Sequence, residues 1–323
     1  MKKNIKKLTL YAATTLLVIS AGIKIKNCKD ESEEFTNKVI EYTTDFDDDD
    51  FLIAAHRGYS SLEVENTKEA LDLANDSDYV DYIEIDVRLT KDKKLVLAHN
   101  NSLLTRQQQT IEICNEKYKD IIDNDYYYLS NSLGIKLENL FNTDNGDILR
   151  ERSKLLESKN YNITSLKDGL NSCKDKKILL DLKFRNNTKD FIKALEKELN
   201  GIDTSNIIFQ SDDLLPLLCL QKKHPEYSYL AIMKTESDLE YIELFDNIGL
   251  KETLVTKKIV NNLIKDDKTV AIWTLNNPSD IDRITNKLGD NYKEVIYISD
   301  YPDVVATCLN EKEKRSEKHF TKN

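Results

Sequence analysis

The feature that most limits the fold of this sequence is a regular alternation, after residue 50, of short apolar runs and longer amphipathic stretches. The runs are almost continuously apolar and rich in β-branched residues, which is typical of parallel strands that are covered on both faces. Most of the stretches between them show the periodicity of amphipathic helices. Eight such runs occur: FLIAAH (51–56), YIEIDVRL (82–89), KLVLAH (94–99), KILLDLKF (177–184), NIIFQS (206–211), YSYLAIM (227–233), TVAIWTL (269–275) and EVIYIS (294–299).

This alternation predicts an α/β fold, a closed (β/α)8 TIM barrel, because eight units over about 270 residues match the size of that fold. An open doubly wound sheet is the alternative, but no glycine-rich phosphate loop follows any of the runs. The interval 103–165 is too long for an ordinary connection and is predicted to be an insertion after strand 3. We therefore predict a barrel at 51–310 and a charged tail at 311–323.

The barrel is preceded by a hydrophobic segment at 1–27 and an acidic linker at 28–50. The uncharged run from Leu8 to Ile23 has 16 residues. As a helix it would measure about 24 Å, short of the roughly 30 Å hydrocarbon core unless flanking lysines extend the span. We expect a membrane anchor, and a cleaved signal peptide is the alternative. The predicted location is the cell membrane with the barrel outside the cytoplasm, or secretion after cleavage.

The net charge of −10 argues against a nucleic-acid partner, since such proteins need a basic face for phosphates. An anionic substrate is still compatible with it, because a metal ion or a few local cations can reverse the potential inside a pocket. No protein partner is evident from the sequence.

Charged residues interrupt two of the apolar runs at alternating positions. Glu84 and Asp86 are two apart in one run, and Asp181 and Lys183 are two apart in another. Side chains two apart on a strand share a face, so each pair points in one direction. Two carboxylates aimed together repel, which raises a pKa or requires a cation.

Further polar residues stand where apolar runs end. His56 and His99 are each the last residue of a run, and Arg57 follows the first of them. In a barrel, these positions lie at the carboxyl-terminal rim, where active sites are built. Trp273 lies on a later run and is a candidate for substrate contact, with packing inside the barrel as the alternative.

This set of residues suits the cleavage of a phosphodiester. Three carboxylates suit a hard divalent cation, Ca²⁺ or Mg²⁺, and Arg57 and Lys183 can hold an anionic oxygen. Two imidazoles on either side of a phosphorus atom can divide the work of general acid and general base. Each of these residues taken alone would more often have a structural role. Together they are hard to explain structurally, because burying each polar group costs free energy.

The same residues carry a family likeness. The segments AHRG (55–58), ENT (65–67), YIEIDVRLTKD (82–92), LVLAH (95–99), AIWTLNNP (271–278) and YISDYPD (297–303) occur in this order. In this respect the chain resembles the glycerophosphodiester phosphodiesterase family from about residue 51 to 305. The resemblance implies a (β/α)8 barrel that uses a divalent metal to hydrolyse glycerophosphodiesters to glycerol 3-phosphate and an alcohol.

By motif, the resemblance makes His56 and His99 the acid and base, Glu84 and Asp86 metal ligands, and Arg57 a phosphate contact. It implies that a glycerol hydroxyl attacks phosphorus and that water then opens the resulting cyclic phosphate.

The chain departs from the family pattern at Asp181 and Asn100, among other positions. The third metal ligand is usually a glutamate and is Asp181 here, and Asn100 stands where an aspartate is usual. Two alternatives stay open: a lyase of the phospholipase D type, found in related barrels, that stops at the cyclic phosphate, and a binding module with the same barrel but little turnover, which the departures at Asp181 and Asn100 suggest. A structural surface protein would leave the strand-end histidines unexplained.

Overall fold

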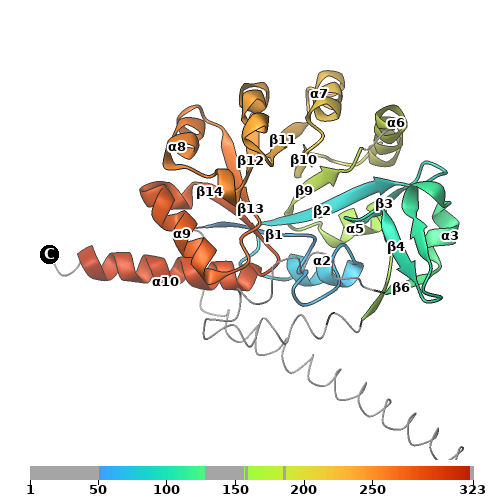
Figure 1. Ribbon diagram of the computed structural model, residues 1–323, viewed down its shortest axis with the longest axis horizontal. Coiled ribbons are helices and arrows are strands. Elements are labelled where there is room, and N and C mark those ends of the chain that lie inside the picture. The colour runs from blue at the N-terminus through green and yellow to red at the C-terminus, as the bar shows by residue number, and fades with distance from the viewer. Residues whose placement is uncertain (1–50, 128–155, 157–158, 185–186, 321–323) are drawn as a thin grey trace, which may run out of the picture. The chain divides into compact units, whose positions relative to one another are not determined.

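The apolar runs form strands that close into an eight-stranded parallel barrel with helices around it, as the sequence predicted (Figure 1). The computed structural model describes residues 51–127, 156, 159–184 and 187–320, the last five by backbone alone, and they all lie in one compact unit, Phe46–Asn323. The predicted segment at 1–27 and the linker at 28–50 lie outside these residues.

Each barrel strand pairs in parallel with the next barrel strand. The first barrel strand pairs with both the second and the last, which closes the ring. In order, the strands are β1 (Leu52–Ala55), β2 (Tyr82–Leu89), β9 (Lys177–Leu182), β10 (Ile207–Ser211), β11 (Ser228–Met233), β12 (Asn247–Lys251), β13 (Thr269–Trp273) and β14 (Val295–Ser299).

The connections between the strands are mostly helices, which surround the barrel (Figure 1). The α-helices are α2 (Lys68–Asn75), α5 (Leu166–Ser172), α6 (Thr188–Leu199), α7 (Leu214–Lys223), α8 (Lys257–Lys265), α9 (Pro278–Leu288) and α10 (Pro302–Phe320). The 3-10 helices on this part of the chain are η4 (Glu236–Leu244), η5 (Glu252–Leu254) and η6 (Gly289–Lys293). Helix α10 continues across residue 310, the predicted end of the barrel domain.

The strand assignment differs from the sequence-based one in two places. The run at 94–99 contains β3 (Leu95–Leu97), which pairs antiparallel with β2 and is not a barrel strand. The missing barrel strand is β12, which was not recognised in the sequence. The insertion therefore follows the second barrel strand, since β9 is the third to join the ring.

The insertion forms a small antiparallel sheet beside the barrel (Figure 1). Its strand order is β5-β4-β6-β7, and β8 pairs with β3 to return the chain to the barrel. The remaining elements are β4 (Ser102–Thr105), β5 (Thr110–Glu112), η1 (Ile113–Asn115), α3 (Tyr118–Ile122), β6 (Asp125–Tyr127), β7 (Asn160–Asn162) and β8 (Thr164–Ser165).

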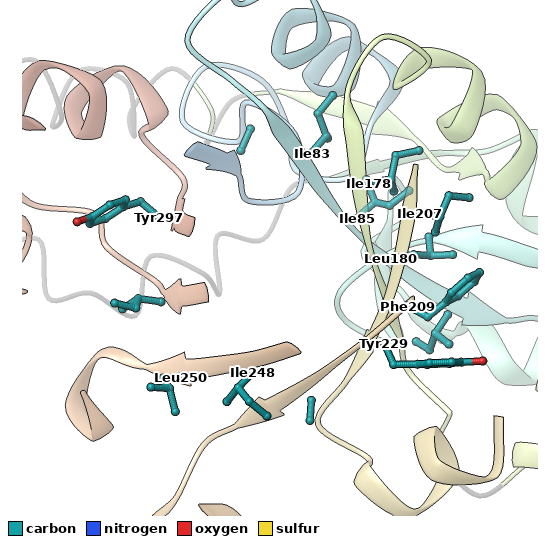
Figure 2. Packing of buried hydrophobic residues seen from close by; sticks show 14 of the residues in the cluster. Ile83, Ile85, Ile178, Leu180, Ile207, Phe209, Tyr229, Ile248, Leu250 and Tyr297 are labelled. Carbon is teal, nitrogen blue, oxygen red and sulfur yellow. The ribbon is translucent and has the colours of Figure 1, made fainter. Parts of the chain in front are cut away.

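Two apolar layers hold the barrel together. One lies between strands and helices and includes Ile83, Ile178 and Phe209 (Figure 2). The other fills the barrel interior and includes Leu179 and Ile296. Burial of each such side chain contributes about 1.5–3 kcal/mol. Because strand side chains alternate, the outward Ile83 and Ile178 fix their neighbours on the inner face, and this places the polar residues of the site.

Candidate active site

A pocket opens at the carboxyl ends of the barrel strands, and all eight candidate residues from the sequence lie on its walls. For the residues on barrel strands this placement follows from the strand ends, because parallel strands bring their carboxyl ends to one rim, whereas His99 reaches the pocket from the loop after the antiparallel strand β3. Sequence analysis did not single out the other residues of the wall. The pocket is lined by His56, Arg57, Glu84, Asp86, His99, Asp181, Lys183, Gln210, Asp212, Leu230, Ile232, Lys234, Trp273 and Ile298.

Three carboxylates converge on the inner face of the barrel. Glu84 and Asp86 extend from β2, and Asp181 on β9 lies in register with Asp86. All three side chains are buried, and one oxygen of each lies within 4.8 Å of the others. Two oxygens that bind one Ca²⁺ at about 2.4 Å are at most about 4.8 Å apart, so this separation is compatible with a shared ion.

Two cationic side chains contact these carboxylates. Lys183 Nζ lies 3.0 Å from Asp86 Oδ1 and 2.5 Å from Asp181 Oδ2. Arg57 Nε lies 3.3 Å from Asp86 Oδ2, and the Arg57 backbone N–H donates to Glu84 Oε2 at 2.9 Å. When all three carboxyls are ionised, these two positive charges leave an excess of negative charge, which favours a further cation.

The pKa values of the carboxylates reflect this crowding. Burial, and then the charge of Asp86, raises the pKa of Glu84 to about 8. Burial also raises the pKa of Asp181 to about 6, against the opposing effect of Lys183. Burial acts in the same direction on Asp86, but Lys183 and Arg57 outweigh it and hold the pKa of Asp86 well below its usual range.

A buried oxygen without a partner points to a ligand. Asp181 Oδ1 is buried and has no hydrogen-bond partner among the described residues. An unpaired buried acceptor of this kind costs about 1–3 kcal/mol unless an ion or water completes it. The three carboxylates therefore fit a hard divalent cation, and they are the cluster of possible metal ligands found among the described residues.

His56 is held by Asp300, which stands directly after the last barrel strand and was not predicted. His56 Nδ1 and Asp300 Oδ1 are 2.6 Å apart, and His56 Nε2 lies 3.8 Å from Glu84 Oε2. Asp300 itself accepts hydrogen bonds from Ser60 Oγ at 3.1 Å and Asn276 Nδ2 at 2.5 Å. The ring of His56 is thus fixed with Nε2 toward the carboxylates.

The pKa of His56 is raised by the carboxylates around its ring. Burial and the charge of Arg57 lower it, but Asp300 and Glu84 outweigh both. Burial lowers the pKa of His99 to about 4, against the opposing effect of Asp86. The two imidazoles of the pocket are therefore shifted in opposite directions.

His99 lies in the loop after β3, outside the barrel ring. Its backbone carbonyl accepts two hydrogen bonds from the guanidinium of Arg88 on β2, from Nε at 2.8 Å and from Nη2. A second pocket, on the side of the insertion, meets the first at His99 and is lined in part by Tyr127 and Tyr161. The insertion thus forms one wall beside the imidazole.

The ENT segment supports the site with each of its side chains. Glu65 accepts a hydrogen bond from Arg57 Nη1 at 2.9 Å. Asn66 donates to Asp86 Oδ2 and accepts from the Asp86 backbone N–H, both at 2.9 Å. Thr67 is the N-cap of α2, where its hydroxyl accepts from the Ala70 N–H. The segment therefore ties the first barrel loop to β2.

Trp273 lies both in the interior of the barrel and on the wall of the pocket. Its side chain packs against the interior layer of the barrel, and it also lines the pocket. The indole Nε1 donates to the Gly249 carbonyl at 3.3 Å.

Fold and pocket together define a (β/α)8-barrel protein with its site at the end of the barrel where enzymes of this fold carry out catalysis. The sequence profile of the Glycerophosphoryl diester phosphodiesterase family matches residues 56–291. The chain therefore belongs to this family.

Solved structures share the fold. An Oleispira antarctica phosphodiesterase in complex with the product sn-glycerol-3-phosphate matches with a TM-score of 0.61 and 17% identity, over 81% of this chain and 97% of that one. A glycerophosphodiester phosphodiesterase from Thermotoga maritima matches with a TM-score of 0.56 and 20% identity, over 80% and 97%.

Two curated relatives, both uncharacterized proteins of Mycoplasma genitalium, match over short segments. One is 53% identical over 53 residues and the other 52% identical over 52 residues. Each alignment covers 16% of this chain and 21% of the relative, so the chain spans about a fifth of the length of these proteins.

Proposed function

We propose that the protein is a divalent-cation-dependent phosphodiesterase that hydrolyses glycerophosphodiesters to glycerol 3-phosphate and an alcohol. The observation that carries the proposal is one pocket that holds two imidazoles, three convergent carboxylates and two cationic side chains. Family membership supports it, and so does a structural relative that was solved in complex with sn-glycerol-3-phosphate.

In this proposal the two histidines move the protons. One removes the proton from a glycerol hydroxyl as its oxygen attacks phosphorus, and the other protonates the alcohol oxygen as its bond to phosphorus breaks. Water then opens the cyclic phosphate, with the two imidazoles in exchanged roles. Asp300 holds His56 through Nδ1, which leaves Nε2 for this transfer. Arg57 and Lys183 lie beside the carboxylates, where they can also contact phosphate oxygens.

Glu84, Asp86 and Asp181 would hold the cation, since their oxygens converge and suit Ca²⁺ or Mg²⁺. A bound cation would supply positive charge that neutralises the phosphate. It would also offset the charge of Asp86, which, after burial, raises the pKa of Glu84.

The proposal is tested by phosphorus NMR of glycerophosphocholine incubated with the full chain and CaCl₂ or MgCl₂. Glycerol 3-phosphate should accumulate, chelator should stop the reaction, and His56→Ala and His99→Ala should each lower the rate at least about 100-fold. Accumulation of a cyclic phosphate would instead indicate the lyase. No turnover with any diester or cation would indicate the binding module.

We also propose that residues 1–27 hold the barrel at the outer face of the membrane, on the basis of their basic start and apolar run. None of the helices within the described ranges combines the length and apolar character needed to cross a bilayer. Fractionation of cells that express the full chain should place it with the membranes, and deletion of 1–27 should release it. If the full chain is found only in the soluble fraction after the cells are lysed, this proposal is contradicted.

A further inference from the structure

Gln210 is a polar residue on the inner face of the barrel that the reaction described above does not use. It lies on β10 in register with Asp181 on β9, and it lines the same pocket. Its side chain is only 3% exposed. Its amide Nε2 donates to Glu84 Oε1 at 3.3 Å. Gln210 thus contacts one predicted metal ligand and is the strand neighbour of another.

The other end of the same amide is unsatisfied. Gln210 Oε1 is buried and has no hydrogen-bond partner among the described residues, and the same is true of Asp181 Oδ1 on the adjacent strand. Buried polar atoms are nearly always paired, so an unpaired one indicates an ion or a water that completes it. Two such oxygens on neighbouring strands of one pocket indicate a shared ligand. Since both are acceptors, that ligand is a cation or is held by one.

A purely structural role does not explain this arrangement. Inner-face positions nearby are filled by Leu179, Leu230 and Ile232, and a residue of that kind would avoid the cost of a buried amide. The amide oxygen of glutamine is among the neutral oxygen ligands that Ca²⁺ accepts.

We propose that Gln210 is a fourth side chain of the cation centre, where its amide nitrogen fixes the Glu84 carboxylate and its amide oxygen serves the cation. This inference rests on the proposed function, because it uses the same carboxylate cluster. As a neutral donor, Gln210 adds an oxygen without adding to the repulsion among Glu84, Asp86 and Asp181.

The test is calorimetric titration of the full chain with CaCl₂ and with MgCl₂, together with thermal unfolding in chelator and in excess cation. Gln210→Met keeps the length of the side chain but has neither the amide nitrogen nor the amide oxygen. We expect this variant to bind the cation about 10- to 100-fold more weakly than the wild type. Its unfolding temperature in chelator should change little, because removal of an unpaired buried oxygen offsets the lost hydrogen bond to Glu84. Gln221→Met makes the same change on α7, outside the pocket, and should bind as the wild type does.

Gln210→Glu keeps a side-chain oxygen at the same position but loses the amide donor to Glu84, so it should bind the cation more tightly than Gln210→Met does. Cation binding by Gln210→Met within twofold of the wild type would overturn the proposal, and so would binding by Gln210→Glu that is no tighter than binding by Gln210→Met. If the wild type binds the cation and cleaves the diester, and Gln210→Met binds the cation as tightly, only the inference about Gln210 is contradicted. If the wild type neither binds cations nor cleaves diesters, the proposed function is contradicted as well.

Discussion

At the scale of single residues, the pair formed by His56 and Asp300 gives a direct test of the site. Asp300→Asn keeps a hydrogen-bonding group beside Nδ1 but loses the charge that stabilises the imidazolium. Because Asp300 raises the pKa of His56, its loss should move the corresponding limb of the pH profile of kcat/KM to lower pH. We also expect kcat to fall by about 100-fold or more.

The control for this change is Asp246→Asn, which alters an exposed carboxylate between η4 and β12. It should leave the pH profile and kcat unchanged. Cation binding should be the same in both variants, since neither residue belongs to the carboxylate cluster. A normal pH profile in Asp300→Asn would show that the ion pair only supports the loop.

Arg88 provides a second prediction, because its guanidinium donates twice to the carbonyl of His99. Lysine cannot reproduce this two-pronged geometry, so Arg88→Lys should let the His99 loop shift. We expect kcat to fall roughly 10- to 100-fold with a KM near that of the wild type, as for the loss of an interaction made in the transition state.

Cation binding by Arg88→Lys should be unchanged, because Arg88 donates to a carbonyl of the loop rather than to a carboxylate of the cluster. Arg283→Lys on α9 alters an exposed arginine and serves as the matched control. If Arg88→Lys and Arg283→Lys have the same kcat, the contact with His99 does not position the imidazole.

The residues of the site differ in how far sequence could reveal them. Glu84, Asp86 and Asp181 were predicted because a charge inside an apolar run is visible without knowledge of the fold. Asp300 was missed because its partner His56 lies 244 residues away and only closure of the barrel brings them together. Gln210 was missed for a related reason, since a neutral amide at a strand end has no distinctive signal in one sequence.

At the scale of elements, the alternation of runs predicted the barrel but not the identity of every strand. The run that contains β3 looks like its neighbours, because its three residues are buried against β2 in an antiparallel pair. Strand β12 was missed because Gly249 at its centre interrupts the apolar run. A Cβ there would lie 2.7 Å from Leu230 Cδ2, so a larger residue at this position would require the Leu230 side chain to shift. Apolar patterns report burial, whereas pairing direction depends on contacts distant in the sequence.

The turn after β1 yields a prediction at this scale. Gly58 has φ of +78°, and a Cβ there would lie 2.7 Å from the backbone carbon of Ala70 in α2. Gly58→Ala therefore combines backbone strain with a clash against a helix, and we expect the free energy of unfolding to fall by about 2–4 kcal/mol. Urea unfolding in the presence of chelator measures this loss.

Gly201→Ala is a matched control, because Gly201 has a similar φ of +82° but nothing within 4 Å of the added Cβ. Only the backbone strain remains there, so the loss should be about 1 kcal/mol. Equal losses at the two positions would mean that α2 moves freely away from the turn.

At the scale of the whole molecule, the ionisation of the buried carboxyls in the site affects the free energy of unfolding of the protein. The net charge is −10, and the barrel nevertheless buries three carboxylates together at one end. A carboxyl whose pKa is raised by folding favours the folded state at low pH, and this contribution is lost as the pH rises through the raised pKa. For Glu84 this window runs from its ordinary value, about 4.5, to about 8.

Without a cation, the unfolding temperature should therefore fall between pH 7 and pH 8.5. The lowered pKa of His99, about 4, acts in the opposite direction only below about pH 6.5, so it does not disturb this range. A cation requires the ionised form of Glu84 and competes with its proton, so cation affinity should rise over the same range. At a cation concentration 100-fold above the dissociation constant, the stabilisation amounts to about 2.7 kcal/mol.

The measurement is the unfolding temperature in chelator and in excess CaCl₂ at pH 7 and pH 8.5. We expect the difference between the two conditions to be larger at pH 8.5. Glu84→Gln should reduce that difference and flatten the pH dependence in chelator, because the amide carries no titratable proton and binds the cation more weakly. His56 also has a raised pKa, so its contribution to stability is lost with rising pH too, and because Glu84 helps to raise that pKa, Glu84→Gln should reduce both contributions. An increment from the cation that is equal at both pH values would mean that Glu84 is already ionised at neutral pH without it.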